Sequence, residues 1–431
     1  MKALKVSENG RFLVTEDEQP FFWLGDTAWE LFHKLNREEA VDYLNQRAAL
    51  GFTVVQAVAL AELEGLTVPN RYGRLPLAVG KDGSIDPESI DDSRYPDSDY
   101  TYWDHVDYIL ETAASLGIYV ALLPTWGDKY NLKWGKGPVI FNPDNAREYG
   151  RWIGKRYGHL KHIIWVLGGD RPLETEEHYA VNRSMAAGIK ESSSNLITFH
   201  PCGGASSSQW VHHEDWLDFN MIQSGHNLAH LHNDDWVTKD YHLTPVKPTV
   251  DAEPRYEDHP IDFLPESGYF DDWDVRQAAY WGFLAGGFGI TYGHHCVWPM
   301  NTEPTPYFPM HWREALGRPA ATHMQHLKKL ALSHNLLELL PDQGLVVVAY
   351  EGGDRLVAAR GKQYAYVYSP TGKSVHARFG LLVGEQVAGS WYNPRSGETM
   401  AIGAWPNTGT LMLHPPSSGR GQDWVLVLDS R

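Results

Sequence analysis

Cysteine is scarce in this chain, and long apolar runs are missing. Cys202 and Cys296 stand far apart, which excludes a disulfide framework and fits a reducing compartment. Residues 1–7 lack the apolar segment of a signal peptide, and no run approaches the length of a membrane span. We therefore expect a soluble cytoplasmic protein with no membrane partner, or a secreted one if a signal peptide has been removed.

Basic residues are also few, because 37 Lys and Arg stand against 54 Asp and Glu, for a net charge of −17. This charge is repelled by nucleic acids and anionic membranes, so neither is an expected partner. Aromatic residues are abundant instead, with 17 Trp and 22 Tyr. Flat rings suit a sugar-binding cleft, although composition alone favours a large aromatic core. The sequence indicates no oligomeric state.

A repeated unit accounts for most of residues 20–335: a short apolar strand, then polar residues, then an amphipathic helix. After a hairpin at 4–15, strands are predicted at 21–29, 52–58, 118–128, 163–172, 196–201, 219–226, 248–254 and 288–295. Helices are predicted at 37–51, 103–116, 145–157, 176–191, 236–242, 274–285 and 320–332. The loop at 202–216 replaces one helix, and a long loop at 62–100 is expected to carry little structure. The pattern predicts an α/β fold, a (β/α)8 TIM barrel.

The spacing of apolar residues along the chain changes near residue 345, where short strands separated by Gly, Pro, Asn and Ser turns begin. They are predicted at 344–349, 356–359, 364–368, 375–379, 387–392, 410–413 and 424–428. This spacing predicts an antiparallel β-sandwich that supports the barrel. We expect a catalytic barrel with its N-terminal hairpin over residues 1–340 and an accessory sandwich over 341–431, joined by a linker at 341–344.

Two carboxylates are placed for glycosidic bond cleavage. In a barrel, the residues that follow the strands converge on one face. Asp170 follows the fourth strand after Gly168 and Gly169, and Glu253 follows the seventh, on the opposite side of the ring. Such a pair can flank a scissile bond, one acid protonating the leaving oxygen and the other attacking or activating water. Asp26 and Asp128 are the main rivals, and Glu62 and Glu64 are weaker candidates.

Other polar and aromatic residues fall at equivalent strand ends. Any one of them alone would be read as a structural polar group, and their coincidence is what favours a binding pocket. The candidate sugar-binding residues are Asp26, Trp29, Gln56, Trp126, Asp128, Arg171, His200, Gln223, His226, Tyr256, His294 and Trp298.

Three further patterns have a weaker functional interpretation. His226, His230 and His232 have a spacing that zinc sites use, but no cysteine is near and a polar loop is the better interpretation. The glycines of 287–289 enter a strand instead of leaving one, so they do not form a dinucleotide loop. Cys202 is interpreted as a small buried residue and not as a nucleophile. No metal and no cofactor is expected.

Several motifs together resemble a known family. They are Phe22-Trp23-Leu24-Gly25-Asp26-Thr27-Ala28-Trp29, Pro124-Thr125-Trp126-Gly127-Asp128, Trp165-Val166-Leu167-Gly168-Gly169-Asp170-Arg171-Pro172, His200-Pro201-Cys202-Gly203-Gly204, Gln223-Ser224-Gly225-His226, Glu253-Pro254-Arg255-Tyr256-Glu257 and Tyr292-Gly293-His294-His295. In this order they resemble the glycoside hydrolase family that contains the bacterial β-D-apiosidases. The similarity extends into the second domain through Tyr392-Asn393-Pro394-Arg395-Ser396-Gly397.

The resemblance implies an exo-acting enzyme that releases terminal β-D-apiose from plant glycosides or from the side chains of the pectin rhamnogalacturonan II. It implies that Asp170 is the acid/base and Glu253 the second catalytic carboxylate. The wider clan has Asn-Glu after the fourth strand where this chain has Gly169-Asp170, so the reach of the acid differs by one methylene. We expect retention, with inversion as the alternative that the carboxyl separation decides.

Three alternatives remain at this stage. A mannanase-like barrel enzyme would have an open aromatic groove, and a non-catalytic carbohydrate-binding protein would bind sugar without hydrolysis. A metal-dependent hydrolase would lose its activity to a chelator.

Overall fold

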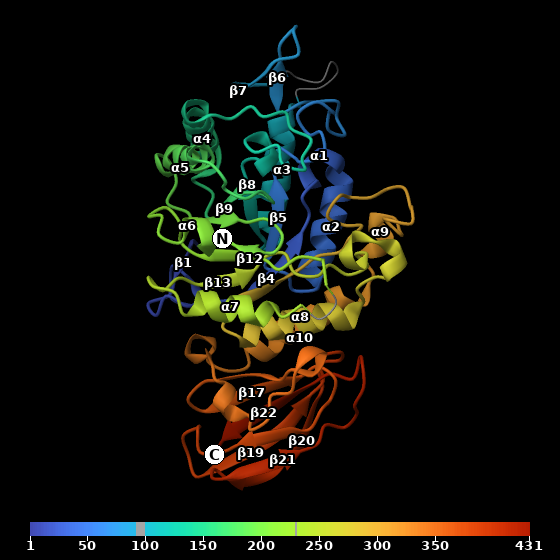
Figure 1. The fold of residues 1–431 in the computed structure, drawn as a ribbon. Coiled ribbons are helices and arrows are strands. Elements are labelled where there is room, and N and C mark those ends of the chain that lie inside the picture. Colours follow the sequence, from blue (N-terminus) through green and yellow to red (C-terminus); the bar gives the residue numbers. More distant parts are fainter. Residues whose placement is uncertain (92–99, 229–230) are drawn as a thin grey trace.

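A ring of parallel strands forms the centre of the larger domain (Figure 1). The computed structural model describes residues 1–91, 100–228 and 231–431. Within these residues the ring has eight strands: β4 (Trp23–Thr27), β5 (Val54–Val58), β8 (Tyr119–Leu123), β9 (Ile163–Gly168), β10 (Ile197–His200), β12 (Asn220–Gln223), β13 (Thr249–Asp251) and β14 (Gly289–Tyr292). They correspond one to one with the strands predicted from the sequence.

Hydrogen bonds join the strands around the ring. One continuous sheet has the order β10-β9-β8-β5-β4-β14, and β12 pairs with β13. The backbone N–H of Asp218 donates to Ile197 (2.8 Å), which links β12 to β10. The N–H of Phe288 donates to Thr249 (3.0 Å), which links β14 to β13. The predicted (β/α)8 TIM barrel is therefore confirmed.

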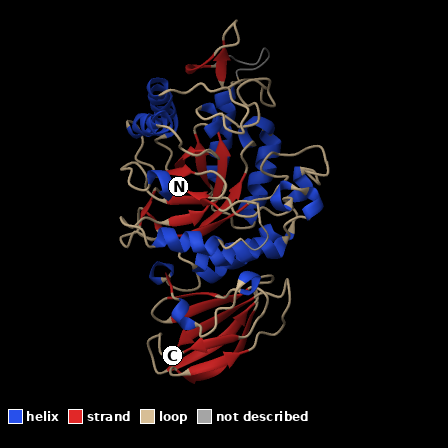
Figure 2. Cartoon of the chain, viewed as in Figure 1, coloured by secondary structure: helices blue, strands red, loops and turns tan. Residues whose placement is uncertain are grey.

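Helices surround the strands (Figure 2). They are α1 (Leu31–Lys34), α2 (Arg37–Ala49), α3 (Tyr102–Ser115), α4 (Pro143–Tyr157), α5 (Glu176–Lys190), α6 (Ser208–Val211), α7 (Asn233–Tyr241), α8 (Asp272–Leu284), α9 (Trp312–Ala315) and α10 (Pro319–Ala331). Reciprocal capping bonds begin four of the longer ones, at Asn36, Thr101, Asn142 and Asp271. The weak helix signal after the fifth strand corresponds to the short α6 and a two-residue strand, β11 (Ala205–Ser206). None of the helices in the described ranges could cross a membrane.

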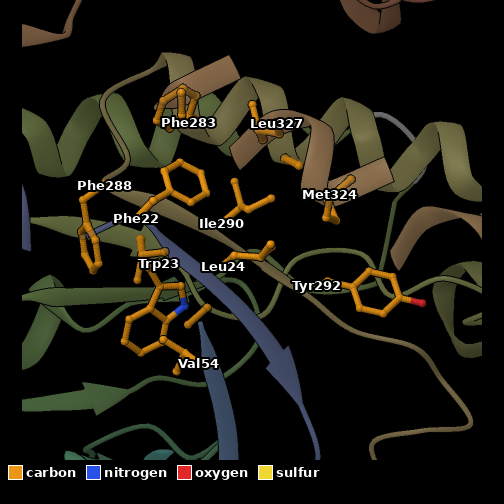
Figure 3. Packing of buried hydrophobic residues seen from close by; sticks show 14 of the residues in the cluster. Phe22, Trp23, Leu24, Val54, Phe283, Phe288, Ile290, Tyr292, Met324 and Leu327 are labelled. Atoms are coloured by element: carbon orange, nitrogen blue, oxygen red, sulfur yellow. The ribbon is translucent and has the colours of Figure 1, made fainter. Parts of the chain in front are cut away.

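Aromatic residues fill the barrel near the start of its strands. Trp23 meets Phe219 and Phe288 edge to face, with ring centroids 5.9 and 6.0 Å apart. Figure 3 shows Trp23 beside Phe288, with Leu24 and Ile290 between the strands and the helices. The N-terminal strands β1 (Leu4–Val6), β2 (Leu13–Thr15) and β3 (Pro20–Phe21) pack against this cluster. The core thus occupies one end of the barrel and leaves the carboxyl ends of the strands for polar residues.

The long loop after the second strand is more ordered than predicted. Strands β6 (Leu77–Val79) and β7 (Ile85–Ile90) form a hairpin that projects from the barrel (Figure 1). The sequence missed it because Leu77 and Pro87 are the only buried residues of the two strands, so the hairpin shows little apolar alternation. Residues 92–99 of the predicted loop lie outside the described residues.

The second domain is an antiparallel sandwich. Its large sheet has the order β15 (Leu340–Pro341), β16 (Val357–Arg360), β17 (Tyr364–Ser369), β22 (Trp424–Ser430), β19 (Gln386–Tyr392) and β20 (Thr399–Pro406). The small sheet pairs β18 (Val375–Arg378) with β21 (Thr410–Leu413). Short 3-10 turns lie at Leu336–Glu338, Gln343–Leu345 and Gly352–Asp354. The predicted strand at 344–349 is wrong: it is such a turn followed by one isolated pairing, of Val346 with Ala377.

The large sheet of this domain is apolar on both faces. One face holds Val367, Leu426 and Leu428 against the small sheet. The other face, with Tyr366, Tyr368 and Val425, packs into the same cluster as helices α8 and α10 of the barrel. Figure 1 shows the domain beneath these two helices. The sandwich therefore covers the outer side of the barrel and leaves the carboxyl ends of its strands uncovered.

Candidate active site

A cavity of about 490 Å³ opens at the carboxyl ends of the barrel strands. It holds both carboxylates that the sequence pairs, one acid from the loop after β5, and a wall of aromatic rings. The residues that line it are Trp29, Glu62, Trp126, Trp134, Asp170, Gly203, Gln223, Gly225, His226, Asn227, Glu253, Tyr256, His259, Phe263, His295, Trp298 and Tyr307.

A tight glycine turn carries Asp170 into the cavity. Gly168 and Gly169 have φ angles of 86° and 109°, which side chains other than glycine rarely adopt. A Cβ on Gly168 would lie 2.3 Å from the carbonyl of His200, and one on Gly169 would lie 2.8 Å from the nitrogen of Gly127. Asp170 itself has a φ of 51°, a strained value that clusters at functional sites. Both glycines are therefore required for Asp170 to leave β9 in this direction.

Arg171 is shared between two acids. Its buried guanidinium donates to Oδ2 of Asp170 (2.9 Å), and Nη2 lies 3.5 Å from Oε1 of Glu62. Burial and the charge of Glu253 raise the pKa of Asp170, while Arg171 lowers it in part. Burial and the charge of Asp170 raise the pKa of Glu62 to about 8. Both acids are thus more suited to hold a proton than an exposed carboxyl group is.

Glu253 lies at the carboxyl end of β13 in the opposite electrostatic environment. Its side chain is 8% exposed. Nε2 of His200 lies 3.1 Å from Oε2, and Nε2 of His226 lies 3.2 Å from Oε1. Burial alone would raise the pKa of Glu253, but the contacts with these two histidines outweigh it and lower the pKa to about 2. Glu253 is therefore anionic.

The pKa values of the two carboxylates are shifted in opposite directions because their surroundings differ. Asp170 is buried beside an arginine and feels the charge of Glu253, whereas Glu253 is contacted by two imidazoles. Pairs of titratable groups with pKa values pushed apart in this way are how acid and base roles are divided in hydrolases. The arrangement can protonate a leaving oxygen and present an anion to the carbon that the oxygen leaves.

Three histidines form a wall beside Glu253, in which His226 stacks on His259 and His295 meets His259 edge to face. The ring centroids of His226 and His259 are 4.1 Å apart, and those of His259 and His295 are 4.3 Å apart. Burial lowers the pKa of His295 to about 3 and also lowers the pKa of His259 strongly, with neighbouring imidazoles adding to the effect. These two rings are therefore neutral, and neutral imidazoles both donate to and accept from hydroxyl groups.

The predicted sugar-binding residues divide into three groups. Those that line the cavity are Trp29, Trp126, Gln223, His226, Tyr256 and Trp298. Arg171 and His200 lie directly behind it, on Asp170 and Glu253. The remaining four, Asp26, Gln56, Asp128 and His294, do not line it and are engaged elsewhere.

Each of these four is held by other protein groups. Asp26 accepts hydrogen bonds from Tyr43 and Arg47. The side chain of Gln56 donates to the carbonyl of Ala252 (2.9 Å). Asp128 accepts from Lys129 and from the N–H groups of Lys136 and Gly137, and His294 pairs with Asp258. Their positions favour support of the strand-end loops over direct contact with substrate.

Several cavity residues were not singled out from the sequence. Trp134, Asn227, His259, Phe263 and Tyr307 come from loops beyond the strand ends, where no periodic pattern marks them. Glu62 was a weak candidate that the structure places in the cavity, while Glu64 is exposed outside it. The sequence could have marked His259 and His295 as cavity residues, because each lies within six residues of a predicted strand end.

The histidine pattern at 226–232 is only partly described, because His230 lies outside the described residues. His226 contacts Glu253, and His232 stacks on Trp281 with centroids 4.8 Å apart. Across residues 1–91, 100–228 and 231–431, no three His, Cys, Asp or Glu side chains are grouped to hold a metal ion.

The barrel and its structural relatives define the chain as a glycoside hydrolase. A family 5 glycoside hydrolase from Bacteroides vulgatus is 32% identical, with a TM-score of 0.90 over 99% of this chain and 93% of that one. A second glycoside hydrolase is 32% identical, with a TM-score of 0.88 over 100% and 97% of the two chains. The endo-1,4-β-mannanase of Rhizomucor miehei, 15% identical, shares the fold, with a TM-score of 0.54 over 77% and 100% of the chains.

The chain belongs to the Apiosidase-like family, because residues 7–338 match the model of the Apiosidase-like catalytic domain. The family resemblance stated from the motifs is therefore confirmed. Residues 340–429 match a different model, a putative collagen-binding domain of a collagenase. No curated protein sequence matches the chain significantly. A glycoside hydrolase acts on a carbohydrate substrate.

Proposed function

We propose that this chain is an exo-acting β-D-apiosidase that works by retention. The observation that carries the proposal is the pair of carboxyl groups at the ends of β9 and β13, whose pKa values move in opposite directions. Asp170 is assigned as the general acid/base and Glu253 as the nucleophile. Apiosylated plant glycosides and the apiose-bearing side chains of rhamnogalacturonan II are the proposed substrates.

The mechanism follows from these protonation states. Glu253 attacks the anomeric carbon of the terminal sugar while Asp170 donates its proton to the leaving oxygen, so the glycosidic bond breaks and a glycosyl ester forms. Asp170, now anionic, then takes a proton from water as that water attacks the same carbon. Release of the sugar returns Glu253 as an anion and Asp170 as an acid.

The shape of the cavity supports action at a chain end. Its volume of about 490 Å³ is in the lower part of the range for small-ligand sites. The packed imidazoles of His226, His259 and His295 form a wall on the Glu253 side, suited to the hydroxyl groups of one terminal sugar. An endo-acting enzyme needs a groove that continues on both sides of the scissile bond.

The test combines a substrate screen with two isosteric variants. The wild-type protein is incubated with aryl glycosides and apiosylated plant glycosides, and the free sugar released is identified. Asp170→Asn and Glu253→Gln are each expected to lower turnover of an apioside by roughly 10²–10⁴-fold, because each removes one partner of the reaction. Unchanged thermal unfolding would show that both variants fold.

Three results would contradict the proposal. Near-wild-type hydrolysis by either variant would remove that residue from the mechanism. Release of internal fragments from a β-mannan would favour the endo-acting alternative. Sugar binding without hydrolysis of any glycoside, unchanged in both variants, would indicate a carbohydrate-binding protein.

A further inference from the structure

Trp134 is a large aromatic residue left exposed at the mouth of the cavity. It lies in the loop between β8 and α4, its side chain is 60% exposed, and it lines the cavity. Its indole N–H is 3.2 Å from Oδ2 of Asp170 and 3.2 Å from the carbonyl oxygen of the same residue. The ring is therefore fixed beside the proposed acid, with much of its surface open to solvent.

The loop that carries Trp134 is held in place from beneath. Asp128 accepts hydrogen bonds from the N–H groups of Lys136 (3.2 Å) and Gly137 (2.8 Å). A Cβ on Gly135 would lie 2.3 Å from Cβ of Asp128 and 2.6 Å from Nη2 of Arg171, so the loop backbone packs directly on both side chains. The guanidinium of Arg171 lies 5.4 Å from the centroid of the indole.

Trp134 also has a strained backbone. Its φ of 45° is an outlier for a bulky residue, a strained conformation that the surrounding structure must hold. The exposed ring buries little surface to offset that strain. A strained, exposed aromatic residue that the surrounding loop holds in place is a reason to look for a ligand that covers it.

The direction of the reaction indicates which part of the substrate meets this ring. The acid must touch the leaving oxygen, so the leaving group lies on the side of Asp170. The sugar that Glu253 attacks lies toward the wall of His226, His259 and His295. A ring fixed on Asp170 therefore adjoins the leaving group and not the terminal sugar.

We propose that Trp134 forms an aglycone subsite that binds leaving groups with a flat apolar face, either an aryl ring or the C–H face of a pyranose. The proposal rests on the proposed function for the positions of acid and nucleophile. It deepens that function by naming the class of leaving group. By analogy with flat bases that stack on aromatic side chains, stacking on one indole face is expected to contribute roughly ten- to a hundredfold in kcat/KM.

The experiment compares three leaving groups on one sugar: methyl, 4-nitrophenyl, and a pyranose in a disaccharide. For each substrate, kcat/KM is measured for the wild type, Trp134→Ala and Trp134→Phe, and only the ratio of variant to wild type is used. Differences in intrinsic reactivity between the leaving groups cancel in that ratio, and Trp134→Phe, which also loses the N–H to Asp170, corrects for their different dependence on the acid. Leu132→Ala is the matched control, since Leu132 is 50% exposed on the same loop but does not line the cavity.

Trp134→Ala is expected to lose about tenfold more kcat/KM on the two flat leaving groups than on the methyl glycoside. Trp134→Phe keeps a flat face and is expected to retain most of this selectivity, although it loses the N–H to Asp170. Leu132→Ala should match the wild type on all three substrates. A selective loss on only one flat leaving group would identify the aryl ring or the pyranose as the ligand.

An equal loss of kcat/KM by Trp134→Ala on all three substrates, or no loss on any of them, would contradict the proposed subsite. These outcomes differ from failure of the proposed function, in which the wild type releases no apiose from any substrate. In that case the same three leaving groups are placed on the sugar that the screen identifies, and the same ratios decide whether the subsite exists.

Discussion

Asp170 and Glu253 face the same cavity, but their neighbours shift their pKa values in opposite directions. Burial and the charge of Glu253 raise the pKa of Asp170, and Arg171, His200 and Trp134 lower it in part. Contacts with two imidazoles lower the pKa of Glu253 by more than burial raises it. The window of activity therefore lies between the pKa of Glu253, about 2, and the raised pKa of Asp170. Above the second value the acid has no proton to donate, so kcat/KM falls.

Replacing Arg171 should move the alkaline side of this window. Arg171→Met removes the cation that lowers the pKa of Asp170, so Asp170 keeps its proton to higher pH. The alkaline limb of kcat/KM against pH is expected to shift upward by about one unit. Arg171→Lys keeps a positive charge and should leave the limb near its wild-type position. A downward shift in Arg171→Met would show that Asp170 is not the group that titrates.

The positions of Asp170 and Glu253 could be predicted because strand ends in a barrel converge on one face. The same signal could not separate them from Asp26 and Asp128, which also follow strands but turn toward Arg47 and Lys129. The direction of a side chain depends on partners that the fold brings together. Trp134 and His259 could not be found either, because loop residues carry no periodicity.

At the scale of elements, Glu257 joins three parts of the barrel. It follows the loop after β13, accepts a hydrogen bond from Tyr292 of β14 (2.7 Å), and accepts another from the N–H of Ala320 in α10 (3.2 Å). Burial raises its pKa to about 7 from an ordinary value of 4.5. The folded chain therefore binds this proton more tightly than the unfolded chain does.

This difference makes stability depend on pH. Between pH 4.5 and about 7 the folded state holds the proton of Glu257 and the unfolded state does not, so the free energy of unfolding falls as pH rises. Glu257→Gln has no such proton. Between pH 4.5 and 8 its free energy of unfolding should therefore fall by about 3 kcal/mol less than that of the wild type. The check is urea unfolding at several pH values. Glu266→Gln, an exposed change in the same segment, should follow the wild-type curve.

Most elements could be predicted, and the longer strands that were missed, β6, β7 and β20, share one cause. Strands β4 to β14 of the barrel are buried and apolar, and capping residues mark the longer helices. By contrast, β20 (Thr399–Pro406) is mostly exposed and contains Gly403 and Pro406, which are usually read as turn residues. Among the residues that the structure describes, it pairs with β19 alone. Edge strands of this kind are held in an extended conformation by that neighbour, and their own sequence lacks the apolar alternation that predicts a strand.

At the scale of the whole molecule, Asp423 joins the two domains. It lies just before β22, is fully buried, and accepts two hydrogen bonds from Arg276 of α8 (3.0 and 2.9 Å). Arg395 and the hydroxyl of Tyr368 also donate to it. Removing a buried carboxylate with this many partners leaves the charges and hydrogen-bond donors of those partners uncompensated.

Asp423→Ala should therefore loosen the contact between barrel and sandwich. We expect the free energy of unfolding to fall by about 3 kcal/mol, because the buried Arg276 and the partly buried Arg395 lose their shared carboxylate. Calorimetry is expected to resolve two transitions, with kcat unchanged at low temperature. Lys373→Ala, which removes an exposed ion pair with Asp354, should change neither quantity. A single unshifted transition in Asp423→Ala would contradict a joining role.

The contact of α8 with the sandwich also has a consequence for synthesis. Every residue of Asp272–Leu284 after the first is buried, and Trp273 and Trp281 donate to the carbonyls of Pro370 and Arg355 in the sandwich. On the ribosome, α8 emerges before any of the strands that cover it. At about 5–20 residues per second, completing those strands takes on the order of ten seconds. During that interval the nascent barrel exposes an apolar helix, so its folding yield should depend on translation speed and on chaperones that bind such surfaces.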